Sequence, residues 1–114
     1  MRISKIAKSP PYAVEKALNG LGRNIRTARL RRKLSRQELA EKIGISRYVM
    51  ADIEKGKTTT AVVAYIGALW ALGLLSAIED LAHPDQDREG KALEASRSPS
   101  TAPKRTSKDM DDDF

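Results

Sequence analysis

The 114-residue sequence contains no cysteine and a single histidine, His83. Without thiols it has no disulfide framework, no thiolate metal site and no cysteine nucleophile, and one histidine cannot build a metal site. The sequence also lacks a phosphate-cradling loop and a pair of acidic residues in a plausible cleft. We therefore expect a protein that is not an enzyme and that holds neither a cofactor nor a metal.

Long apolar runs are missing as well. The most apolar segment, residues 61–75, is shorter than the roughly 20 residues that a membrane-spanning helix needs. Residues 1–12 are basic but lack the apolar stretch of a secretory signal. The sequence thus predicts a cytoplasmic protein with no membrane anchor.

Apolar residues become scarce beyond His83. Residues 84–114 hold only Leu93, Met110 and Phe114 as large apolar side chains, too few to offset the entropy of ordering the chain. We expect residues 84–114 to form a disordered tail. This segment has 6 Lys/Arg against 8 Asp/Glu, which leaves a net charge of +8 on residues 1–83. A small unit with that surplus attracts polyanions, with DNA, RNA or a membrane surface as the options.

The remaining residues follow a helical apolar spacing throughout, with no strand pattern, so we predict an all-α fold. Capping residues, glycines and Pro84 delimit five expected helices, at about 9–33, 35–44, 46–55, 61–72 and 75–82. Ser9 is the expected cap of the first helix, and Gly20 and Gly22 are expected to weaken, bend or break its middle. The predicted organisation is a flexible basic arm over residues 1–8, a domain over residues 9–83 and the tail.

Residues 36–56, RQELAEKIGISRYVMADIEKG, carry the most informative pattern. Ala40 leaves room for a second helix to approach, and Gly44 supplies a turn four residues later. Apolar side chains surround this pair, at Leu39, Ile43, Ile45, Met50 and Ile53. Ser35 and Glu38 form a capping box before the first of the two helices. The pattern predicts a helix-turn-helix, which places its second helix in the major groove of DNA.

The amino end of that second helix is expected to face the groove floor. The candidates for contacts with base edges are Ser46, Arg47, Tyr48 and Asp52. Arg47 is the leading reader, because a bidentate arginine–guanine pair is the commonest specific contact, with simple phosphate binding as its alternative. Tyr48 either reads DNA, stacks on a sugar or stays partly buried. Asp52 either accepts from a cytosine amino group or rejects unsuitable sequences.

With this motif and the E-K-G-K at 54–57, residues 21–82 resemble the phage-repressor (Cro/C1, or Xre) family. The resemblance implies a five-helix, lambda-repressor-like domain and a structural ion pair between Arg29 and Glu54. It also implies a phosphate contact at Arg36, where the family usually has Gln, with Gln37 displaced by one position. Lys55, Lys57 and Thr58 follow the reading helix, where side chains and backbone amides are placed to bind phosphate.

The fourth helix, AVVAYIGALWALGL, is apolar on all sides. We expect Val62, Ile66 and Leu69 to close the core, which leaves an apolar surplus that is typical of an interface. The prediction is a homodimer on a palindromic operator, with Tyr65, Trp70 and Leu74 in the dimer interface. The alternative is a large monomer core that includes the first helix.

The whole chain also resembles HipB-type antitoxins in its PPYAVEKAL lead-in, its GRNIRTARLRRK helix, its LWALGLLSAIEDLAHP run and its acidic, aromatic end. This resemblance implies repression of the chain's own operon and binding of a HipA-like serine/threonine kinase toxin. Asp113 and Phe114 are the expected toxin contacts, with Phe114 as the anchor. The alternatives for DDDF are a solubilising terminus and a tail that folds back on the basic domain. The alternative function is a free-standing Xre-family repressor.

Overall fold

A computed structural model describes residues 3–97 of the chain. The chain divides into two compact units, with the boundary between Glu79 and Asp80. Within the described residues all regular structure is helical, so the prediction of an all-α fold is confirmed. None of these helices combines the length and the hydropathy that crossing a bilayer requires.

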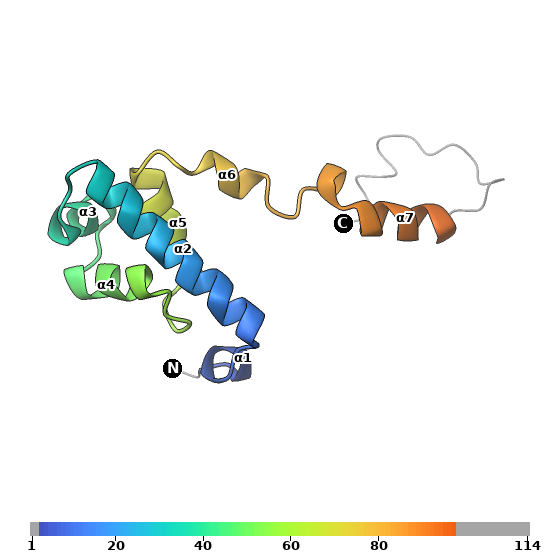
Figure 1. The fold of residues 1–114 in the computed structure, drawn as a ribbon, viewed down its shortest axis with the longest axis horizontal. Coiled ribbons are helices and arrows are strands. Elements are labelled where there is room, and N and C mark those ends of the chain that lie inside the picture. Colours follow the sequence, from blue (N-terminus) through green and yellow to red (C-terminus); the bar gives the residue numbers. More distant parts are fainter. Residues whose placement is uncertain (1–2, 98–114) are drawn as a thin grey trace. The chain divides into compact units, whose positions relative to one another are not determined.

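The first unit contains six of the helices drawn in Figure 1. They are α1 (Lys5–Lys8), α2 (Tyr12–Arg31), α3 (Arg36–Ile43), α4 (Arg47–Lys55), α5 (Val62–Ala71) and α6 (Ser76–Glu79). The long helix α2 packs on α4, and α3 packs on both α4 and α5. The amino end of the predicted reading helix, α4, is exposed at Arg47 and Tyr48, while its carboxyl end packs against α2 at Gly22.

The caps of the two motif helices are confirmed. The Ser35 side chain accepts from the Glu38 backbone, and the Glu38 carboxylate accepts from the Ser35 N–H, each at about 3 Å. Ser46 begins α4 by accepting from the Val49 N–H at 3.1 Å. Gly44 and Gly56 end α3 and α4 in the left-handed conformation, with φ of 72° at both. These local signals therefore fix the bounds of α3 and α4.

The amino-terminal region differs from the prediction. Residues 5–8 of the expected flexible arm form the short helix α1, which Ser4 caps. Pro11, rather than Ser9, is the N-cap of α2. Two successive prolines explain the shift, because the residue before a proline is disfavoured in the helical conformation and α2 begins only after the second one.

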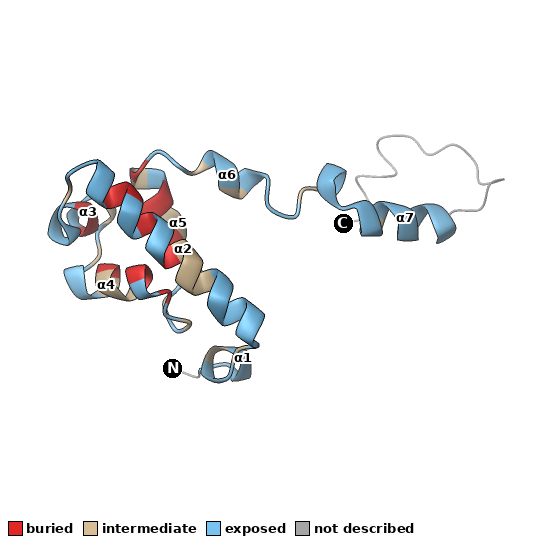
Figure 2. Ribbon diagram, viewed as in Figure 1, coloured by how far each residue is buried: buried red, intermediate tan, exposed pale blue. Residues whose placement is uncertain are grey.

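The core lies between α2, α3, α4 and α5, as the red segments of Figure 2 show. Its fully buried large side chains are Ile25, Leu39, Met50 and Ile53. Ala40 is also fully buried, as its role in the helix crossing requires. Of the three α5 residues that we expected in the core, Leu69 is buried and Ile66 is half-buried. Val62 is 70% exposed, because α5 turns Tyr65 and Ala68 inward beside Leu69 instead.

Gly22 lies where α2 crosses the end of α4, and the helix continues through it without a break. A Cβ atom at Gly22 would lie 2.6 Å from the carbonyl oxygens of Ile53 and Glu54. A Cβ at Gly56 would lie 2.5 Å from the Leu18 carbonyl oxygen. The two glycines thus let the backbones of α2 and α4 approach closely, a role that the predicted weakening of α2 did not include.

The second unit contains the 3₁₀ turn η1 (Pro84–Gln86) and α7 (Arg88–Arg97). Residues 84–97, which we placed in a disordered tail, are therefore helical for most of their length. Local interactions account for this: α7 is rich in good helix formers, and Asp87 accepts from the Gly90 N–H at 2.9 Å. None of its residues is buried, in keeping with the scarcity of apolar side chains.

Candidate nucleic-acid interface

The candidate interface is built around the exposed amino end of α4. Met50 and Ile53 anchor this helix in the core, while Arg47 and Tyr48, on its first turn, face solvent. Tyr48 is 68% exposed, so the option that this side chain stays partly buried is wrong. The helix thus presents its first turn on a support that packing holds rigid.

Arg47 and Tyr48 interact with each other at this exposed end. The Arg47 Nη2 donates to the Tyr48 hydroxyl at 3.0 Å, and the Arg47 guanidinium carbon lies 5.1 Å from the centre of the Tyr48 ring. A cation over an aromatic face is attracted by the ring's negative face. The two contacts restrict the guanidinium, and Arg47 remains an exposed residue.

Asp52 lies about one and a half helical turns beyond Arg47 on α4 and forms an ion pair with Lys57. Its Oδ1 lies 3.8 Å from Lys57 Nζ, with the Asp52 side chain one-third exposed. The two charges partly neutralise each other in this arrangement. The ion pair of Asp52 therefore links the reading helix to the loop that follows it.

Glu54 is bound by two arginines. Arg29 donates from Nε to Oε2 at 2.6 Å and from Nη2 to Oε1 at 3.0 Å, and both side chains are almost fully buried. Arg36 also donates from Nε to Glu54 Oε1 at 3.0 Å, from a half-exposed position at the start of α3. We expected Arg36 to bind phosphate alone, and its bond to Glu54 was not predicted.

This network also sets the charge of Glu54. Burial raises the pKa of Glu54, but the hydrogen bonds and positive charges of Arg29 and Arg36 outweigh burial and hold it below its ordinary value of 4.5. Arg29 additionally donates from Nη1 to the Leu34 carbonyl at 2.8 Å. The network therefore ties α2, the turn before α3, α3 and the end of α4 together beneath the candidate interface.

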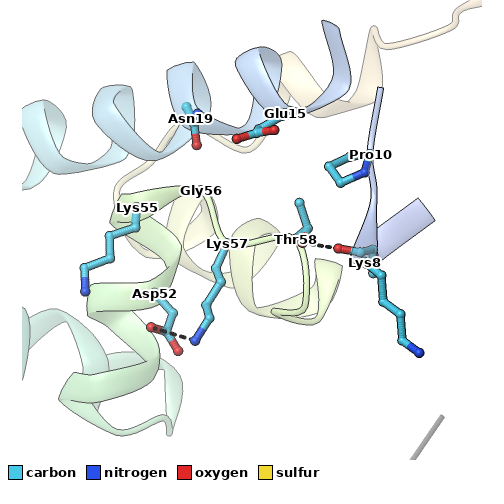
Figure 3. A pocket seen from close by; sticks show the side chains of 10 residues that line it. Lys8, Pro10, Glu15, Asn19, Asp52, Lys55, Gly56, Lys57 and Thr58 are labelled. Carbon is cyan, nitrogen blue, oxygen red and sulfur yellow. Dashed lines mark hydrogen bonds and ion pairs between the residues drawn. The ribbon is translucent and has the colours of Figure 1, made fainter. Parts of the chain in front are cut away.

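The predicted phosphate-binding residues differ in their exposure and in their hydrogen-bond partners. Lys55, the last residue of α4, and Lys57, in the loop after it, are exposed around a hollow of about 410 Å³ that Figure 3 shows from close by. Gln37 is exposed and donates to Glu41 within α3 at 2.9 Å. The Thr58 hydroxyl donates to the carbonyl of Ala7 at 2.7 Å, so its proton is already engaged. A phosphate contact of Thr58 stays a prediction for its backbone amide.

Tyr65 also requires a correction, since we placed it in a dimer interface. It is 3% exposed, and its hydroxyl donates to the Lys57 carbonyl at 2.8 Å. Burial, and secondarily the charge of Asp52, raises the pKa of this phenol. Tyr65 is a core residue that fastens α5 to the loop after α4, and the helical pattern alone did not reveal which face of α5 it occupies.

The apolar side chains of α5 that stay out of the core lie on a different side of the helix from Tyr65. Val63 and Trp70 are 72% and 60% exposed, and Leu74 is exposed just beyond the helix. A hollow of about 350 Å³ runs between α3 and α5. It is lined by Lys42, Ile43, Ile45, Val63, Ala64, Gly67 and Trp70. An apolar groove therefore crosses this side of the first unit.

Two predicted site residues, Asp113 and Phe114, lie outside the described residues. Within residues 3–97, no group of three or more His, Cys, Asp or Glu side chains is arranged to hold a metal ion.

The comparisons with known proteins agree with this geometry. A family model described as a helix-turn-helix domain matches residues 20–80. No curated protein and no solved structure matches the chain. The matched segment covers α3, α4, α5 and α6 and the part of α2 from Gly20 onward.

Proposed function

Because the chain belongs to the helix-turn-helix domain family, a DNA-binding family, we propose that it is a transcriptional repressor that reads a palindromic operator through α4. The observation that carries the proposal is the exposed Arg47–Tyr48 pair on the first turn of a helix that the core holds rigid. An exposed arginine held by a neighbouring tyrosine suits the O6 and N7 acceptors of guanine.

In this proposal the other interface residues divide into two groups. Ser46 caps α4 and lies at the groove floor beside Arg47. Arg36, Gln37, Lys55 and Lys57 bind the DNA backbone on either side of the groove, where contacts fix the register without reading sequence. Asp52, paired with Lys57, acts against unsuitable bases.

The test compares Arg47→Ala with Lys57→Ala on an operator selected from random duplexes. Arg47→Ala is expected to lose discrimination at one base position, at a cost of about 1–3 kcal/mol. Lys57→Ala is expected to weaken binding to all sequences alike and to lower the salt slope by about 1. If Arg47→Ala discriminates as well as the unmodified chain, the reader has been wrongly assigned.

We further propose that the repressor is a homodimer. Val63, Trp70 and Leu74 together with the groove between α3 and α5 form an apolar surface that a second copy would cover. A twofold dimer places two reading helices about 34–36 Å apart, to match two half-sites of a palindrome.

The finer proposal is that the chain is a HipB-type antitoxin. Its support is the resemblance of the lead-in, of α2 and of the run from α5 onward, together with the acidic end and its terminal Phe114. The antitoxin would repress its own operon and hold a HipA-like kinase toxin, with Asp113 and Phe114 at the contact. A free-standing repressor of the Xre family is the second candidate, and a kinase gene of this type next to the chain's own gene distinguishes the two.

A further inference from the structure

The amino-terminal segment is attached to the loop that follows the reading helix. Thr58 Oγ1 donates to the Ala7 carbonyl at 2.7 Å, across 51 positions of sequence. Helix α1 has no buried residue, so no apolar core fixes it in this position. The hydrogen bond from Thr58 is the one direct polar contact between α1 and the loop within the described residues.

The attachment extends the hollow beside α4. Ala7, Lys8 and Pro10 line one side of it, Glu15 and Asn19 of α2 line another, and the end of α4 with its loop closes the third. In Figure 3 the side chains of Lys8, Lys55 and Lys57 all point away from α2, toward the same side of the unit. Two chain segments far apart in sequence therefore present ammonium groups in one direction.

The charge of this segment favours a polyanion. Residues 1–11 contain Arg2, Lys5 and Lys8 and no acidic residue. At the loop, Asp52 offsets Lys57, with 3.8 Å between their charged atoms. Glu15 also lines the hollow, but neither Lys55 nor Lys8 forms an ion pair within 4 Å among the described residues. The position of these lysines, beside the end of α4, is where the backbone of a duplex bound at α4 would continue.

We propose that α1 is a second phosphate-binding element, docked by Thr58 so that Lys5 and Lys8 bind the DNA backbone next to Lys55 and Lys57. This inference rests on the proposed DNA-binding function and adds a segment to its interface. Thr58 is a positioning residue in this arrangement, since its hydroxyl proton is spent on Ala7. A membrane surface is the less suitable polyanion, because a four-residue helix offers too little apolar area to lie in the lipid interface.

The experiment measures binding to a random-sequence duplex by fluorescence anisotropy over a series of salt concentrations. Each lost phosphate contact lowers the slope of log affinity against log salt by about 1. Lys8→Ala is expected to show that loss together with a several-fold lower affinity at low salt. Lys91→Ala is the charge-matched control, because its ammonium is bonded to the Asp85 carbonyl within the second unit, and it should leave the slope unchanged.

The role of Thr58 is tested with two substitutions. Thr58→Val keeps the shape but removes the hydroxyl, and it should lower the slope by about 2, because it releases both Lys5 and Lys8. Thr58→Ser should keep the slope of the unmodified chain. In a chain that lacks residues 1–8, Thr58→Val should have no further effect, because the segment it positions is gone. An equal loss in the shortened chain would mean that Thr58 binds phosphate itself, and would overturn the proposal.

The remaining outcomes separate this inference from the function on which it rests. If the unmodified chain binds the duplex and Lys8→Ala has the same salt slope, the inference about α1 is overturned and the proposed function stands. If the unmodified chain does not bind the duplex, both are overturned. If Lys8→Ala weakens binding to vesicles that contain phosphatidylserine and leaves DNA binding unchanged, the segment belongs to a membrane contact and the inference is overturned.

Discussion

At Gly22 the backbone of α2 meets the backbone at the end of α4, and no side chain fits between them. The two carbonyl oxygens that a Cβ would approach, those of Ile53 and Glu54, belong to the end of the helix that presents Arg47. Backbone atoms cannot move aside as a flexible side chain can. Gly22 therefore sets how α4 is held, although a glycine inside a helix reads from sequence as a weak point.

Gly22→Ala is expected to destabilise the protein by about 1–3 kcal/mol, because the added methyl group forces α2 and α4 apart. Gly20→Ala is the matched control on the same helix. Its Cβ would meet nothing closer than the Arg23 Nη2 at 3.8 Å, so a stabilisation of up to about 1 kcal/mol is expected from helix propensity. Thermal unfolding followed by circular dichroism measures both changes, and equal effects would contradict the assigned close approach.

The buried Glu54 makes a pH dependence that can be measured. Its pKa is lowered in the folded state, so its stabilisation is complete above the ordinary pKa of 4.5 and is lost as the pH falls through the lower folded value. We expect the free energy of unfolding of the unmodified chain to decrease below about pH 4.5. In Glu54→Gln this contribution to the decrease should be absent, and urea unfolding at pH 7 and at lower pH checks it.

At pH 7, removing one partner of the pair should be costly. Arg29→Ala leaves a buried carboxylate with only the half-exposed Arg36 as its partner, at an expected cost of about 3–5 kcal/mol. Glu38→Ala serves as the comparison among the acidic residues, because Glu38 is exposed and only caps α3. A similar loss of stability in both variants would contradict a special role of the buried pair.

The two sides of α5 have different roles, one in the core and one on the surface. The uniformly apolar sequence of this helix does not distinguish them. One side, with Tyr65, Ala68 and Leu69, closes the core, and the other leaves Val63 and Trp70 exposed beside the groove with α3. An apolar helix does not by itself say which side faces inward, because every face satisfies the core equally well. The contact of α5 with α3 and the hydrogen bond of Tyr65 decide it.

Trp70→Ala is expected to shift the protein from dimer to monomer, because Trp70 is a large, exposed aromatic side chain at the proposed interface. Val62→Ala is the control: Val62 is equally exposed on α5 but does not line the groove. Sedimentation velocity at micromolar concentration measures the change. A monomeric unmodified chain, or a Trp70→Ala variant that stays dimeric, would contradict the assigned interface.

At the scale of the whole molecule, the first unit accounts for DNA binding, and the antitoxin proposal depends on residues beyond it. Deleting residues 108–114 is expected to weaken co-purification with a HipA-like kinase and to leave the affinity for operator DNA unchanged, since the deletion removes the proposed Phe114 anchor and no helix of the first unit. Phe114→Ala in the full chain is the narrower variant. Equal recovery of the kinase with the intact and shortened chains would exclude the tail as the anchor.

The helices α3 and α4, their caps and the class of the fold follow from the sequence alone. Ser35, Ser46, Gly44 and Gly56 act through hydrogen bonds and backbone angles within a few residues, so their effect is readable locally. The Arg29–Glu54 pair was implied by family resemblance and is present with two hydrogen bonds.

Which groups meet across the chain depends on how the helices pack in three dimensions. Tyr65 is buried, Gly22 is a contact point and Thr58 is bonded to Ala7, and each depends on a neighbour distant in sequence. Arg36 likewise gains Glu54 as a partner from another helix. Residue type and spacing specify a helix and its apolar face, because they act within a few residues. The particular atoms that come into contact depend on the close packing of α2, α4 and α5, and this packing positions the residues of the interface.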